Sequence, residues 1–200
     1  MVKYRLPNGL VVILQPIESA VSLSVGLWVK TGSRHELSSQ YGYAHFVEHM
    51  LFKGTTSRSA KEIAQMVDRV GGQHNAATNR EYTCFYVNVM SDYADLSLSL
   101  LSDMYYNSLF DKAEIEKEIG VVLEEINMYE DTPDDLIHDV FMDSILGGHP
   151  LGHPILGYKK TIEGITRESI LEYYDSHYTN DNSVLVVAGK FEESAMKTLV

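Results

Sequence analysis

The stretch His45-Phe46-Val47-Glu48-His49 decides both the fold and the chemistry that this sequence predicts. The pattern favours a helix over about 43–52, in which His45 and His49 leave the same face one turn apart. Two imidazoles on one helix face are a common way to hold a zinc ion. Glu48 lies beside them, where its carboxylate can take a proton from a water molecule at the metal. Because such a pair can also be an ordinary surface feature, the interpretation needs a third ligand.

The best source of a third ligand is a second predicted helix, over 111–129. Catalytic zinc usually has three protein ligands and one open position. Glu118 and Glu125 are seven residues apart, two turns along one face, whereas Glu124 points about 100° away from Glu125. Spacing alone does not choose among these three carboxylates. They also fit a solvated acidic helix face, which is the usual meaning of a run of charges.

Composition places the chain among ordinary globular proteins. It has 200 residues, 44% of them hydrophobic, and a formal net charge of −12. We expect one domain over 1–200. The acidic balance argues against a nucleic-acid surface. No apolar run is long enough for a membrane span, and the N-terminal residues do not resemble a signal peptide, so we expect a cytoplasmic protein without membrane contact. The single Cys84 cannot form an internal disulfide, which fits a reducing compartment.

Hydrophobic periodicity and turn signals predict an alternation of strands and helices. Strands are expected at 4–6, 10–14, 21–29, 73–78, 82–90 and 182–188. Further helices are expected at 59–70, 92–107, 133–146, from 166 or 169 to 177, and at 192–200. This irregular order predicts an α+β fold, in which a largely antiparallel sheet packs against helices as a two-layer sandwich. The small and polar residues of 73–78 suit an exposed edge strand. The last helical pattern is still running at Val200, so we expect the chain to be part of a longer protein.

Three elements together resemble the pitrilysin and mitochondrial processing peptidase family of zinc peptidases. They are the H-x-x-E-H stretch, which is the inverzincin signature, the pair Gly71-Gly72 followed by Asn75-Ala76, and the glutamate-bearing helix. The resemblance covers nearly the whole chain, as the N-terminal catalytic domain of that family. It implies that the third zinc ligand is Glu125, which follows His49 by the family's spacing. It also implies that Glu118 orients or tunes the metal site.

The resemblance further implies a zinc-dependent endopeptidase that hydrolyses extended peptides or leader segments. Zinc would be held by His45, His49 and Glu125, with Glu48 as general base. The substrate would lie along the 73–78 edge strand, near Asn75 and Ala76. In the family a homologous C-terminal half, or a separate partner subunit, completes the site, so the isolated chain is expected to be incomplete. The alternative is a non-catalytic peptide-binding or structural module on the same fold.

Overall fold

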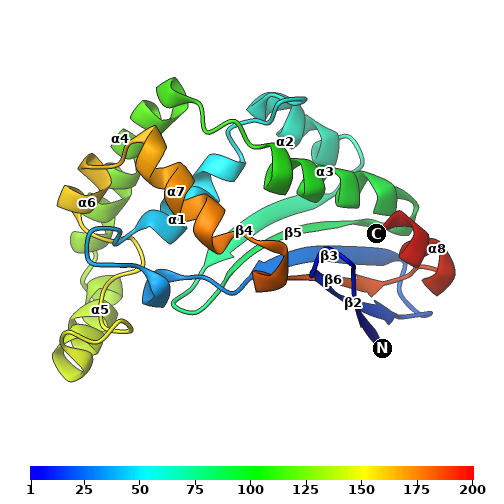
Figure 1. Ribbon diagram of the computed structural model, residues 1–200, viewed down its shortest axis with the longest axis horizontal. Helices are drawn as coiled ribbons and strands as arrows, with labels where there is room; N and C mark the ends of the chain where they lie inside the picture. The colour runs from blue at the N-terminus through cyan, green and yellow to red at the C-terminus, as the bar shows by residue number, and fades with distance from the viewer.

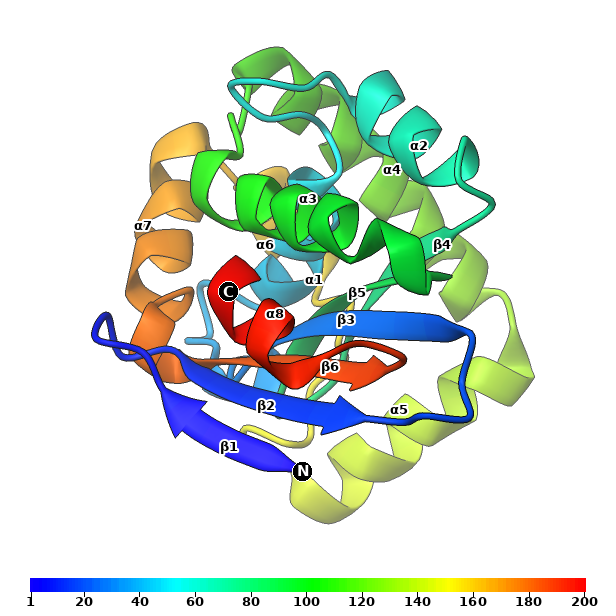
Figure 2. The ribbon, with the colours of Figure 1, turned by 90° about the vertical axis from the view of Figure 1, so that its right-hand side faces the viewer.

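The fold is one mixed sheet whose helices gather mainly over one face (Figures 1 and 2). The computed structural model describes residues 1–200. Its strands are β1 (Val2–Arg5), β2 (Val11–Pro16), β3 (Ser22–Val29), β4 (Gln73–Thr78), β5 (Thr83–Met90) and β6 (Ser183–Gly189). Its helices are α1 (Tyr43–Leu51), α2 (Ala60–Asp68), α3 (Ala94–Asn107), α4 (Lys112–Glu130), α5 (Pro133–Leu146), α6 (Lys159–Glu163), α7 (Arg167–His177) and α8 (Glu193–Leu199). The predicted α+β class is confirmed.

The sheet has the strand order β1-β2-β6-β3-β5-β4. Every neighbouring pair is antiparallel except β2 and β6, which run parallel with Val11 opposite Val184. After α7 the chain returns to the sheet as β6, which lies between β2 and β3 and runs parallel to β2. β4 lies at one end of the order, so the predicted edge strand is an edge strand.

Strand β3 shows how the sequence pattern sets the two layers. Leu23, Val25, Leu27 and Val29 are buried, while the alternate Trp28 is exposed. Period-two alternation sends these two sets to opposite faces, and the apolar set meets the helices. The resulting core is one cluster of 34 buried residues.

Helix α1 crosses this core rather than lying on its surface. Phe46, Val47 and Met50 are completely buried, and Leu51 is 1% exposed. The side chains of His45 and His49 therefore leave a helix whose apolar side chains are fixed by packing in the core. Such a helix can hold side chains in place before any ligand arrives.

The structure differs from the sequence-based prediction at a few boundaries. Helix α6 was not predicted, because five residues are too few to show a helical period. The helix predicted from residue 92 is preceded by a 3₁₀ turn, Ser91–Tyr93, so α3 begins at Ala94. Helix α5 has the predicted bounds, and Pro133 occupies its first turn, where a missing N–H costs nothing.

Candidate metal centre

The helix that carries the histidine motif begins at an unusual cap. Gly42, the residue before α1, has φ +96° and no side chain to accept a hydrogen bond from the first turn. The buried carboxylate of Glu36 replaces it, accepting from the N–H of Gly42 at 2.9 Å and from that of Ala44 at 2.7 Å. Burial raises the pKa of Glu36 to about 8, although these backbone donors lower it. Glu36 thus anchors the residue that immediately precedes His45.

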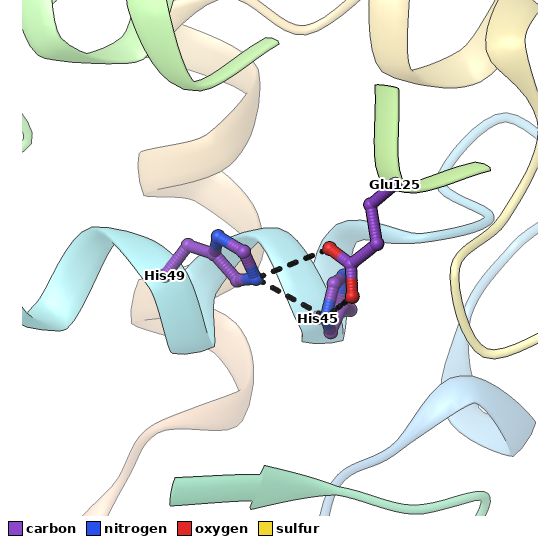
Figure 3. A group of neighbouring side chains, drawn as sticks. All are labelled: His45, His49 and Glu125. Carbon is purple, nitrogen blue, oxygen red and sulfur yellow. Dashed lines mark hydrogen bonds and ion pairs between the residues drawn. The ribbon is translucent and has the colours of Figure 1, made fainter. Parts of the chain in front are cut away.

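His45 and His49 point their ring nitrogens at one place (Figure 3). Their Nε2 atoms are 3.2 Å apart. The carboxylate of Glu125 on α4 approaches both, with Oε1 3.8 Å from Nε2 of His45 and Oε2 3.6 Å from Nε2 of His49. These three residues form the one cluster of metal-ligating side chains in the structure.

The spacing of these atoms can be compared with that of a zinc site. Zinc bonds to nitrogen and oxygen of about 2.0–2.2 Å in tetrahedral geometry place neighbouring ligand atoms about 3.3–3.6 Å apart. The two Nε2 atoms are 3.2 Å apart, and each lies 3.6 or 3.8 Å from a different oxygen of Glu125, which is close to that range. With one ligand atom taken from each residue, all three lie within 4.8 Å of one another. The residues present therefore fit a tetrahedral ion with three protein ligands.

The three candidate glutamates of α4 have three different surroundings. Glu125 is half-buried and faces the histidines, whereas Glu124 is exposed. Glu118 is buried, and its Oε1 lies 2.7 Å from Nδ1 of His49. The rotation of α4 about its axis, which spacing alone does not reveal, separates the alternatives that the sequence left open.

The surroundings of the two histidines differ: His45 is held neutral, whereas His49 lies beside the negatively charged Glu118. Burial lowers the pKa of His45 to about 3. Burial also lowers the pKa of His49, but the hydrogen bond and negative charge of Glu118 outweigh it, so the pKa is raised overall. Burial raises the pKa of Glu118, yet His49 and the Lys53 ammonium, which pairs with its other oxygen, hold it below the ordinary value. Glu118 is thus an anion that fixes the ring of His49.

Glu48 lies on the side of α1 that faces the edge strand β4. Its Oε2 accepts a hydrogen bond of 2.5 Å from Oγ1 of Thr78, the last residue of β4. Burial raises the pKa of Glu48, and the Thr78 hydroxyl lowers it. Sequence reasoning missed Thr78, as it missed Glu36 and Lys53. No local pattern marks them, because each acts through a partner elsewhere in the chain.

Asn75 and Ala76 lie in the middle of β4. Asn75 is exposed, and its side-chain oxygen accepts from the N–H of Ala76 at 2.9 Å. An N–H that is bonded to an exposed side chain is not used in the ladder with β5. The N–H of Ala76 therefore lies on the free edge of the sheet, and peptide binding at Asn75 and Ala76 stays a prediction.

Comparison with known proteins identifies the family. The family model described as "Insulinase (Peptidase family M16)" matches residues 11–159, and that of the "Peptidase M16 inactive domain" matches 164–200. The chain belongs to peptidase family M16. An uncharacterized zinc protease of Bacillus subtilis, YmxG, is 45% identical over 98% of this chain and 48% of its own length. One from Rickettsia felis is 44% identical over 94% of this chain and 46% of its own.

Solved structures agree with the fold. A protease from Helicobacter pylori superimposes with a TM-score of 0.95 at 27% identity, covering 98% of this chain and 48% of that one. Pitrilysin gives 0.87 at 26% identity, covering 98% and 22%. The predicted resemblance to the pitrilysin family is thereby confirmed.

The comparisons also bear on cofactor, completeness and location. The relatives are named zinc proteases, and His45, His49 and Glu125 form a cluster that could hold a metal ion in this chain. The chain spans about half the length of the curated relatives it matches. No helix combines the length and apolarity needed to cross a membrane. One structural neighbour is a periplasmic protease, so the cytoplasmic location stays a prediction.

Proposed function

We propose that this chain is the catalytic domain of a zinc-dependent endopeptidase, in which His45, His49 and Glu125 hold the metal. The observation that carries the proposal is that one ligand atom from each of these three residues lies within 4.8 Å of the other two. Glu48, which is half-buried, follows His45 by three residues on α1. Glu118 supports the site by accepting from His49 Nδ1, which leaves Nε2 of that ring for the metal.

Glu48 is the general base of the proposed reaction. Bound zinc would polarise the scissile carbonyl and make water a better nucleophile near neutral pH. Glu48 takes the proton from the attacking water and passes it to the departing amine. Burial raises the pKa of Glu48, which brings the carboxylate closer to the range where it can both accept and release a proton.

The substrate pairs with β4 as an added strand. The N–H of Asn79 donates to the carbonyl of Tyr82 at 2.8 Å, which marks 79 and 82 as a hydrogen-bonded pair of the β4–β5 hairpin. In an antiparallel ladder such pairs alternate, so the backbone groups of His74, Ala76 and Thr78 point away from β5. An extended peptide that pairs with these groups, replacing the contact of the Ala76 N–H with Asn75 Oδ1, can bind with little dependence on its side chains.

A second half completes the enzyme. Because the chain spans about half the length of its relatives, a homologous C-terminal half or a separate partner subunit is proposed to close over the peptide. The 200-residue chain alone should therefore bind zinc but cleave peptides poorly.

The test compares Glu48→Gln with wild type, with and without the downstream half that the relatives carry. We expect the variant to retain zinc, measured by elemental analysis, and to lose cleavage of an extended fluorogenic peptide by at least about 100-fold. Glu124→Gln, an exposed carboxylate on α4, is the matched control and should change neither quantity. Full activity in Glu48→Gln would exclude this residue as the base. A wild type that binds peptide but no zinc would support the non-catalytic module instead.

A further inference from the structure

Thr78 links the proposed base to the proposed peptide-binding edge. It is the final residue of β4, half-buried, and its hydroxyl donates to Oε2 of Glu48 at 2.5 Å. Strand and helix are 30 residues apart in sequence at this contact. It is the one side-chain hydrogen bond between α1 and β4.

The side chain of Thr78 is well suited to fix another group. Threonine is branched at Cβ, so the backbone of β4 restricts where its hydroxyl can point. A glutamate side chain has three rotatable bonds and is ordered only by its contacts. With Oε2 held by the single proton of the Thr78 hydroxyl, Oε1 of Glu48 is left as the oxygen that can accept a proton from water.

The backbone of the same residue belongs to the free edge. Thr78 pairs with Thr83 at a position of the ladder where both backbone groups point away from the partner strand. A peptide that extends the sheet along β4 therefore meets the main chain of Thr78 beside the Glu48 carboxylate, whose pKa the backbone N–H of Thr78 also lowers. Its hydroxyl meanwhile reaches back to Glu48. One residue thus contacts both parts that must be aligned for the reaction.

We propose that Thr78 is a positioning residue, which orients the carboxylate of Glu48 relative to a peptide bound on β4. This inference rests on the proposed function of Glu48 and β4. Reaction rates depend steeply on such alignment, since a displacement of about 1 Å can cost about 100-fold. Thr78 acts through Glu48 and does not itself exchange a proton with the substrate.

The experiment uses the protein together with its downstream half. Thr78→Val keeps the shape and branching of the side chain but removes the donor, whereas Thr78→Ser keeps the hydroxyl. We expect Thr78→Val to lower kcat about 10- to 100-fold with KM changed less than about threefold. Thr78→Ser should recover most of kcat. Zinc content should stay at the wild-type level in both variants.

A second measurement separates positioning from a general structural effect. In the Glu48→Gln background Thr78→Val should cost little further activity, because the group on which it acts is already lost. Crystal structures of the 200-residue chain should show the Glu48 carboxylate displaced in Thr78→Val and in place in Thr78→Ser. That comparison needs no activity, so it remains decisive even if the chain proves not to be a peptidase. Wild-type kcat in Thr78→Val, equal losses in both variants, or an unmoved Glu48 carboxylate would each overturn the proposal.

Discussion

Replacing Glu118 by alanine should weaken zinc binding while leaving the three proposed ligands intact. Glu118 is 3% exposed and accepts from Nδ1 of His49 at 2.7 Å, so it fixes both the rotation of that ring and the nitrogen that carries its proton. Without this acceptor the half-buried Nδ1–H of His49 has no protein partner. The ring can turn, and Nε2 is held less firmly toward Glu125.

The magnitude follows from the kind of contact that is lost. Removing a carboxylate that orients a metal-bound histidine typically costs 10- to 100-fold in metal affinity. The dissociation constant for zinc should therefore rise by about 10- to 100-fold, which corresponds to about 1.4–2.7 kcal/mol. Glu118→Gln keeps an oxygen for the Nδ1–H but loses the charge that pairs with Lys53, so its effect should be smaller.

The assay is a competition titration of the 200-residue chain against a chromophoric zinc chelator. Glu124→Ala removes an exposed carboxylate six residues further along the same helix and should leave the dissociation constant unchanged. Circular dichroism spectra would check that each variant is folded. Equal zinc affinity in Glu118→Ala and Glu124→Ala would refute the reasoning, because Glu118 would then have no part in orienting His49.

Two further predictions concern the stability of the chain. Burial raises the pKa of Asp103, but hydrogen bonds from Thr55 and three other donors bring it down to about 2. As the pH falls, the unfolded chain takes up this proton at a higher pH than the folded chain does. The ionised carboxylate therefore stabilises the fold above about pH 4, by on the order of 2 kcal/mol, and this contribution is lost as the pH falls from about 4 to about 2. The free energy of unfolding, measured in urea across that pH range, should fall in wild type and fall less in Asp103→Asn. The same dependence on pH in both proteins would count against this role of Asp103. Each oxygen of Glu36 accepts a hydrogen bond from one backbone N–H, of Gly42 or of Ala44. In Glu36→Gln one of these oxygens becomes an NH₂ group, which cannot accept that hydrogen bond. The substitution should lower the free energy of unfolding by about 1–3 kcal/mol, and an unchanged urea midpoint would contradict that role for the cap.

Much of the fold could be predicted from local patterns. The alternation of β3, the turn between the first two strands and the bounds of α5 are all short-range features. The small polar residues of β4 correctly indicated an edge strand. The parallel pairing of β2 with β6 could not be predicted in this way, because it joins residues such as Val11 and Val184 that no periodicity relates.

In the candidate site, too, local contacts could be predicted from the sequence and long-range contacts could not. His45, Glu48 and His49 are recognisable because one helix turn brings them together, and the family resemblance then pointed to Glu125. Neither helical period nor composition indicates that Thr78 contacts Glu48, a partner 30 residues away. Long-range packing decides such contacts, so they become visible only once the sheet and α1 are assembled.

The way α1 is held implies that metal binding uses a site already built by folding. Its first turn is capped by Glu36, and Phe46 and Met50 on its inner face are fully buried. Where zinc organises a small domain, the ligands come together only when the metal binds, and the binding energy is spent on folding. Here a core of 34 residues fixes the helix, while Glu118 fixes the ring of His49. The free energy needed to order the proposed ligands is therefore supplied by folding. Metal binding does not have to supply it, so most of the intrinsic affinity of these side chains is available for holding the ion.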